Sequence, residues 1–148
     1  MSIIGFPAKV IFDTSIYIPL INKGITHPLL NQPYTRPVIY MSAVVMEELY
    51  AGAFDQKSIK LLNKLYDTFK NLNRLMVPDG SEWQTAGKIV AKLGQKHGFE
   101  SKYLSKIQND ILIALSARRI GAIVITNNMQ DFFRIKEFVD FEFVDNLQ

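Results

Sequence analysis

Four acidic side chains stand where a carboxylate is either out of place or chemically useful. Asp13 directly follows the apolar run VIF, and Asp110 interrupts the apolar stripe of a predicted helix. Glu48 and Asp131 each come shortly after a further apolar run. A charge next to buried apolar residues should be paired or should hold a metal ion. Because the chain has no cysteine and only two histidines, a cluster of these acids would suit a hard divalent cation, Mg²⁺ above all, which takes oxygen ligands and keeps several waters.

Each acid also has a purely structural interpretation. Asp110 could be a first-turn or N-cap acid that favours the helix dipole. Glu47 and Glu48 open a predicted helix, where acids are common, and helical periodicity does not separate the two. Asp131 could cap the short helix that follows it. No single acid therefore decides between a structural and a catalytic role.

The hydrophobic pattern predicts strands and helices that alternate along the chain. Gly, Pro and N-cap residues mark their ends. The proline-containing stretch 25–37 is expected to be a loop or extended connection. The predicted strands are 10–13, 38–41, 75–78, 122–126 and 138–144, and the last of them is expected to be an edge strand. The first predicted helix runs from a cap at Thr14 or Ser15 to near Gly24, and the second covers 43–54 after a cap at Ser42. The later helices are predicted over 56–74, from a cap at Asp79 or Ser81 to about Gly98, over 105–121, and briefly within 127–135.

This alternation predicts an α/β fold with a mostly parallel sheet and helices on both faces. In such folds, ligands gather at the carboxyl ends of the strands. Asp13 follows the first strand, whereas Asn127, Asn128 and Asp131 follow the strand at 122–126. Because parallel strands end at the same edge, we expect these distant segments to meet there.

Length and composition limit which classes of protein are possible. The 148 residues predict one domain over 1–148, and the apolar runs are too short to cross a membrane, so a cytoplasmic protein without a membrane partner is expected. A net charge of +3 permits a phosphate-rich partner without indicating one. His27 and His97 lie outside the motifs and are interpreted as surface or loop residues. Four basic residues could contact phosphate, although each is more simply a solvated surface charge: Lys102, Lys106, Arg118 and Arg119.

Four segments together resemble the PIN-domain proteins, and among them the VapC-like toxins of toxin–antitoxin modules. They are VIFDTSIYI near the start, MSAVVMEELYAGA in the second strand–helix unit, NDILIALSAR in a later helix and AIVITNNMQDF near the end. Each segment alone is a weak signal. Their common order and spacing make the resemblance fairly specific.

The resemblance implies a set of site residues. Glu48 is preferred to Glu47 because the Leu and Gly of the family's Glu-Leu-x-x-Gly pattern follow it. Asn128 stands where some members have Asp, so either it or the nearby Asp131 completes the set. The implied metal-binding and catalytic acids are Asp13, Glu48, Asp110 and Asp131, with Ser15, Thr126 and Asn128 in support.

The resemblance also implies a three-layer α/β/α sandwich, dependence on Mg²⁺ or Mn²⁺, and endoribonuclease activity. For a toxin it further implies a homodimer and a cognate antitoxin protein as a second partner besides the RNA substrate. Hydrolysis of RNA phosphodiester bonds, assisted by one or two metal ions, is the expected reaction. The alternatives are a PIN-domain nuclease of RNA maturation or decay, or one acting on DNA flaps, and a non-catalytic α/β binding module whose acids only cap helices.

Overall fold

A computed structural model describes residues 9–25 and 37–146 of the chain. Strands and helices alternate over most of this length, as the sequence pattern predicted. Most of the proline-containing stretch 25–37, together with His27, lies outside the described residues. The elements are β1 (Lys9–Phe12), α1 (Thr14–Lys23), β2 (Val38–Ser42), α2 (Ala43–Ala51), α3 (Gln56–Asn71), β3 (Leu75–Met76), α4 (Gly80–His97), α5 (Ser101–Ile120), β4 (Ile123–Thr126), α6 (Met129–Lys136) and β5 (Glu142–Asp145).

The five strands form one sheet in the order β3-β2-β1-β4-β5, and every pairing is parallel. β1 is central, with Val10 opposite Ile39 of β2 and Ile123 of β4. The carboxyl ends of β1 and β4 therefore lie side by side. The expectation that Asp13 and the residues after β4 share one edge of the sheet is confirmed.

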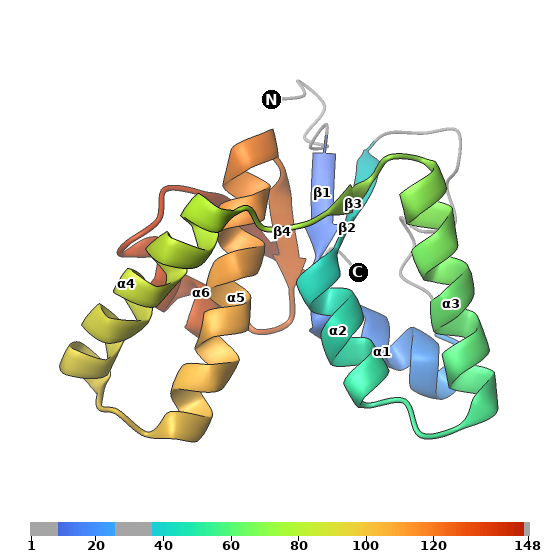
Figure 1. Cartoon of the computed structure of the whole chain (residues 1–148), viewed down its shortest axis with the longest axis horizontal. Coiled ribbons are helices and arrows are strands. Elements are labelled where there is room, and N and C mark those ends of the chain that lie inside the picture. Colours follow the sequence, from blue (N-terminus) through green and yellow to red (C-terminus); the bar gives the residue numbers. More distant parts are fainter. Residues whose placement is uncertain (1–8, 26–36, 147–148) are drawn as a thin grey trace.

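Helices cover both faces of the sheet and give the three-layer α/β/α arrangement that was expected (Figure 1). Figure 1 shows α4, α5 and α6 on one side of the strands and α1, α2 and α3 on the other. The core is continuous between the sheet and α5, because Val10–Phe12 of β1 and the apolar residues in the middle of α5 are fully buried and the two elements are in contact. None of the helices described is long and apolar enough to cross a membrane.

Several boundaries differ from those predicted. Asp13, and not Thr14 or Ser15, is the N-cap of α1, because its carboxylate accepts a hydrogen bond from the backbone N–H of Ser15. Helix α5 begins at Ser101, with Glu100 as its cap, and not at 105. The last strand is confined to Glu142–Asp145, although it is an edge strand as expected.

Candidate active site at the carboxyl edge of the sheet

Asp13 is a buried carboxylate placed between β1 and α1. Only 4% of its surface is exposed. The Ser15 hydroxyl donates to Oδ1 at 2.5 Å, and the Thr126 hydroxyl, from the end of β4, donates to Oδ2 at 2.6 Å. The first turn of α1 and the end of β4 thus each bind one oxygen of the Asp13 carboxylate.

The loop after β4 is tied to the same point. The backbone N–H of Asn127 donates to the Ser15 hydroxyl at 2.9 Å, and that of Asn128 donates to the Thr126 hydroxyl at 2.8 Å. The Asn128 amide then donates to Oδ2 of Asp131 at 2.9 Å. Asp131 is only 8% exposed and lies in the first turn of α6. Asn128 therefore positions Asp131, and both belong to the candidate site.

Asp110 lies in the middle of α5, so the interpretation of it as a first-turn or N-cap acid is wrong. The helix starts at Ser101, nine residues earlier. Asp110 is 7% exposed, and its Oδ2 is buried without a hydrogen-bond partner. Burial, reinforced by the charges of Asp13, Glu48 and Asp131, raises the pKa of Asp110 to about 8.

Glu48 approaches the same group from α2. The Thr14 hydroxyl donates to its Oε1 at 2.5 Å, and the Asn109 amide donates to its Oε2 at 3.1 Å. Its charge also acts on Asp13. Glu47, the neighbouring acid, is exposed and lines a separate pocket beside Asn109. Glu48 is thus the acid of α2 that lies with the other carboxylates.

The cluster is electrostatically unfavourable in the absence of a cation. Burial raises the pKa of Asp13 even though hydrogen bonds from Ser15 and Thr126 lower it, and the charge of Glu48 raises it again. Among described residues the nearest compensating charge is Lys106, whose Nζ lies 3.5 Å from Oδ2 of Asp131. That ammonium belongs to a side chain that is 62% exposed, so it offsets little of the buried charge.

A hard divalent cation fits this donor set. The unpartnered Oδ2 of Asp110, with three further acids acting on it, is a place where a positive charge would be stabilised. Within the described ranges, no three Asp, Glu or His side chains are already grouped as a finished set of metal ligands. Mg²⁺ does not require such a set, because it is usually bound by one or two carboxylates with waters and substrate phosphates completing its shell.

The four basic residues considered as phosphate contacts lie in different environments. Lys102 and Arg118 are exposed, and Lys106 pairs with Asp131. Arg119 does not reach the acids: its guanidinium bonds the buried Glu82 and the carbonyl of Val77. Arg119 is therefore neither a phosphate contact at this site nor a merely solvated surface charge.

Two polar residues contribute in ways that were not predicted. Thr14 was expected to start the helix and to steady the Asp13 carboxylate with Ser15, and Asn109 was not considered at all. Both bond Glu48. The available signal was position, since each is adjacent in sequence to a candidate acid. His97, expected at the surface, is exposed at the end of α4.

Comparison with known proteins gives the family. The chain is 28% identical over 133 residues to ribonuclease VapC2 of Haemophilus influenzae, covering 86% of this chain and 92% of that protein. Its fold is similar to that of VapBC-1 from nontypeable Haemophilus influenzae, with a TM-score of 0.63, 22% identity, and coverage of 95% and 99% of the two chains. DNA-bound VapBC from Salmonella typhimurium gives a TM-score of 0.64 at 22% identity, with coverage of 93% and 97%. Residues 10–137 match the PIN domain, so the chain belongs to the PIN-domain family.

Proposed function

We propose that this chain is a Mg²⁺-dependent endoribonuclease and the toxin of a toxin–antitoxin pair. The observation that carries the proposal is that acids from three other segments act on Asp110, which has a buried oxygen without a hydrogen-bond partner. These acids lie at the carboxyl edge of a parallel sheet, which is the usual place for a ligand in such folds. The name of the relative, ribonuclease VapC2, supports RNA as the substrate.

In this proposal Asp13, Glu48, Asp110 and Asp131 hold the metal ion, and Mn²⁺ can replace Mg²⁺. When bound, the ion supplies a water of lowered pKa and offsets the charge that develops at the scissile phosphate. No side chain has to form a covalent bond to the substrate. The two histidines have no assigned part.

The remaining residues fix the acids. Ser15 and Thr126 orient the Asp13 carboxylate, and Thr14 and Asn109 orient that of Glu48. Each of these donors is uncharged, so it orients a carboxylate without taking the place of the metal ion as a positive charge. Lys106, by contrast, is positively charged. Since its ammonium is largely exposed and close to Asp131, it can move to a substrate phosphate.

An antitoxin partner is also proposed. Three of the structural relatives are VapBC proteins, two of them bound to DNA, which supports a second protein that accompanies the toxin. A homodimer and a cytoplasmic location are proposed on the same family grounds. A PIN-domain nuclease of RNA maturation would share the site and would differ in its effect on the cell.

RNA cleavage by the purified protein tests the proposal. We expect cleavage with Mg²⁺, none with EDTA, and loss of cleavage in Asp13→Asn with the thermal transition retained. Asp140→Asn, which changes an exposed carboxylate outside the cluster, is the matched control and should cleave normally. Cleavage by Asp13→Asn at the parent rate would refute the site. Growth arrest on expression without a partner distinguishes a toxin from a maturation enzyme.

A further inference from the structure

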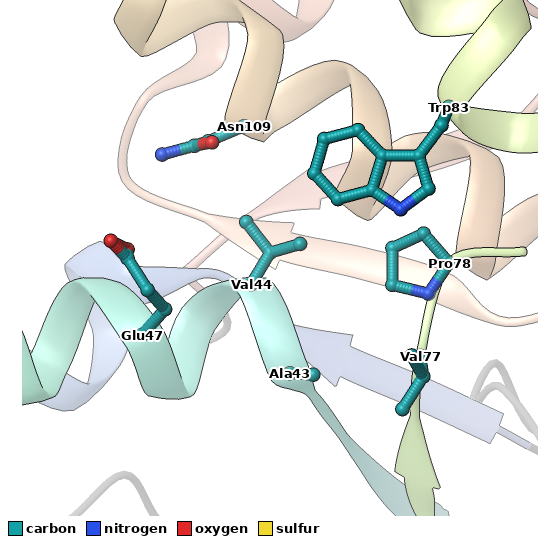
Figure 2. A pocket seen from close by; sticks show the side chains of 7 residues that line it. All are labelled: Ala43, Val44, Glu47, Val77, Pro78, Trp83 and Asn109. Atoms are coloured by element: carbon teal, nitrogen blue, oxygen red, sulfur yellow. The ribbon is translucent and has the colours of Figure 1, made fainter. Parts of the chain in front are cut away.

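A pocket of about 320 Å³ lies beside the candidate active site (Figure 2). It is formed where α2, α5 and the connection from β3 to α4 come together. Its polar residues belong to α2 and α5, whereas its ring side chains come from the connection and the start of α4. The lining residues are Ala43, Val44, Glu47, Val77, Pro78, Trp83 and Asn109.

The pocket presents flat apolar groups to solvent. Trp83, the only tryptophan of the chain, is 50% exposed, and Val77 is 58% exposed. Figure 2 shows the indole of Trp83 and the ring of Pro78 at one end of the pocket, with Glu47 at the other. A half-exposed indole beside a proline ring is a suitable surface for stacking a planar group.

This wall is held rigidly. Trp83 follows Glu82, which forms a capping box with Asp79 at the start of α4. The Glu82 carboxylate is 5% exposed and is bound by the guanidinium of Arg119 at 3.1 Å. Arg119 also donates to the carbonyl of Val77 at 2.8 Å. The backbone on both sides of Pro78 is therefore fixed before any ligand arrives.

The pocket adjoins the acidic cluster through Asn109. Asn109 lines the pocket and also donates to Oε2 of Glu48 at 3.1 Å, and the next residue is Asp110. A polymer whose phosphate lies at the acids would thus place an adjoining group at Asn109. Lys106, one turn earlier on the same helix, supplies a largely exposed positive charge for its backbone.

We propose that this pocket binds one unstacked base of the single-stranded RNA substrate, by stacking on Trp83. The inference rests on the proposed ribonuclease function. The apolar lining and the carboxylate of Glu47 disfavour a phosphate but suit a base, whose amino group can donate to that carboxylate. The volume is at the small end for ligand pockets, which matches a single ring system better than a folded segment.

Tryptophan fluorescence tests the proposal directly, because Trp83 is the only indole. In an Asp13→Asn background, which prevents cleavage, a short single-stranded RNA should quench the fluorescence, and an abasic ribose-phosphate oligomer of equal length should not. In the parent background, Trp83→Ala should raise the KM for RNA about tenfold, since stacking one base is worth ~1–3 kcal/mol. Trp83→Phe should stay within about threefold of the parent, and Trp83→Leu should resemble Trp83→Ala.

Phe54→Ala is the matched control, because Phe54 is 91% exposed in the connection between α2 and α3 and does not line the pocket. It should leave the KM unchanged. Normal RNA cleavage and KM in Trp83→Ala would overturn the base subsite while leaving the ribonuclease function intact. If Trp83→Ala lost self-association or antitoxin binding while its KM stayed unchanged, the pocket would be a protein-binding surface, and the base subsite would be overturned as well. A parent protein that does not cleave RNA would refute the proposed function itself.

Discussion

Replacing Asp110 by Asn should stabilise the metal-free protein at neutral and alkaline pH, although it should abolish metal-dependent activity. The Asp110 carboxyl has a pKa of about 8 in the folded protein because of burial and three neighbouring acids, against an ordinary value of 3.8. The folded state therefore binds the proton more tightly than the unfolded state. Where the folded state binds more protons, the free energy of unfolding falls as the pH rises.

The size of the effect follows from these two values. Between pH 5 and pH 7, the carboxyl of Asp110 is ionised in the unfolded chain and largely protonated in the folded one, so folding takes up close to one proton. The slope is then about 1.4 kcal/mol per pH unit, or about 3 kcal/mol over the interval. This contribution is fully lost only above the folded-state pKa. In Asp110→Asn it is absent, because the amide does not titrate.

Urea denaturation in EDTA at pH 5, 6 and 7 measures this difference. We expect the parent to lose about 3 kcal/mol more than Asp110→Asn between the end points, which corresponds to a difference in thermal midpoint of ~6–12 °C for a chain of this size. His97 is exposed and is present in both proteins, so it does not contribute to the difference between them. Equal pH slopes in the two proteins would refute the assignment of a protonated, buried Asp110.

Four further substitutions separate the roles of individual residues. With RNA at saturating concentration, Glu48→Gln should reduce the cleavage rate at least tenfold, whereas Glu47→Gln should leave it near that of the parent; the reverse order in this assay would exchange the two assignments. Thr126→Val should lower the free energy of unfolding by ~1–3 kcal/mol in urea denaturation, because it leaves a buried oxygen of Asp13 and the N–H of Asn128 without partners. Arg119→Ala should cost about 2 kcal/mol, less than the ~3–5 kcal/mol for a fully buried pair because the Arg119 side chain is 39% exposed. A midpoint unchanged by Arg119→Ala would show that Glu82 does not depend on this pair.

The sheet and the edge that carries the acids could be predicted because both depend on local patterns. A short β-branched run ending in Asp13, and another ending in Thr126, are enough to place both residues at one edge once the strands are parallel. The predicted α/β fold is confirmed on this basis. The start of α5 was placed too late because its first residues, from Ser101, carry few apolar side chains and the helix there is determined by the cap at Glu100.

Other features depend on contacts between distant segments. Glu47 and Glu48 are neighbours on one helix, and helical periodicity does not separate them. The family pattern favoured Glu48, and the contacts of Glu48 with Thr14 and Asn109 became visible only in the structure. The role of Arg119 as the partner of Glu82 likewise required two helices to be placed together. The pocket around Trp83 could not be predicted from the sequence, because the exposure of a tryptophan becomes known only once its surroundings in the structure are known.

Calorimetric titration of Mg²⁺ into the parent protein tests most directly whether acids from four segments form one cation site. We expect saturable binding at pH 7, with the release of about one proton as the carboxyl of Asp110 ionises, detected by repeating the titration in buffers of different ionisation enthalpy. Asp13→Asn should bind the ion much more weakly, and Asp140→Asn should bind it as the parent does. Absence of binding by the parent, or equal binding by Asp13→Asn, would contradict the account.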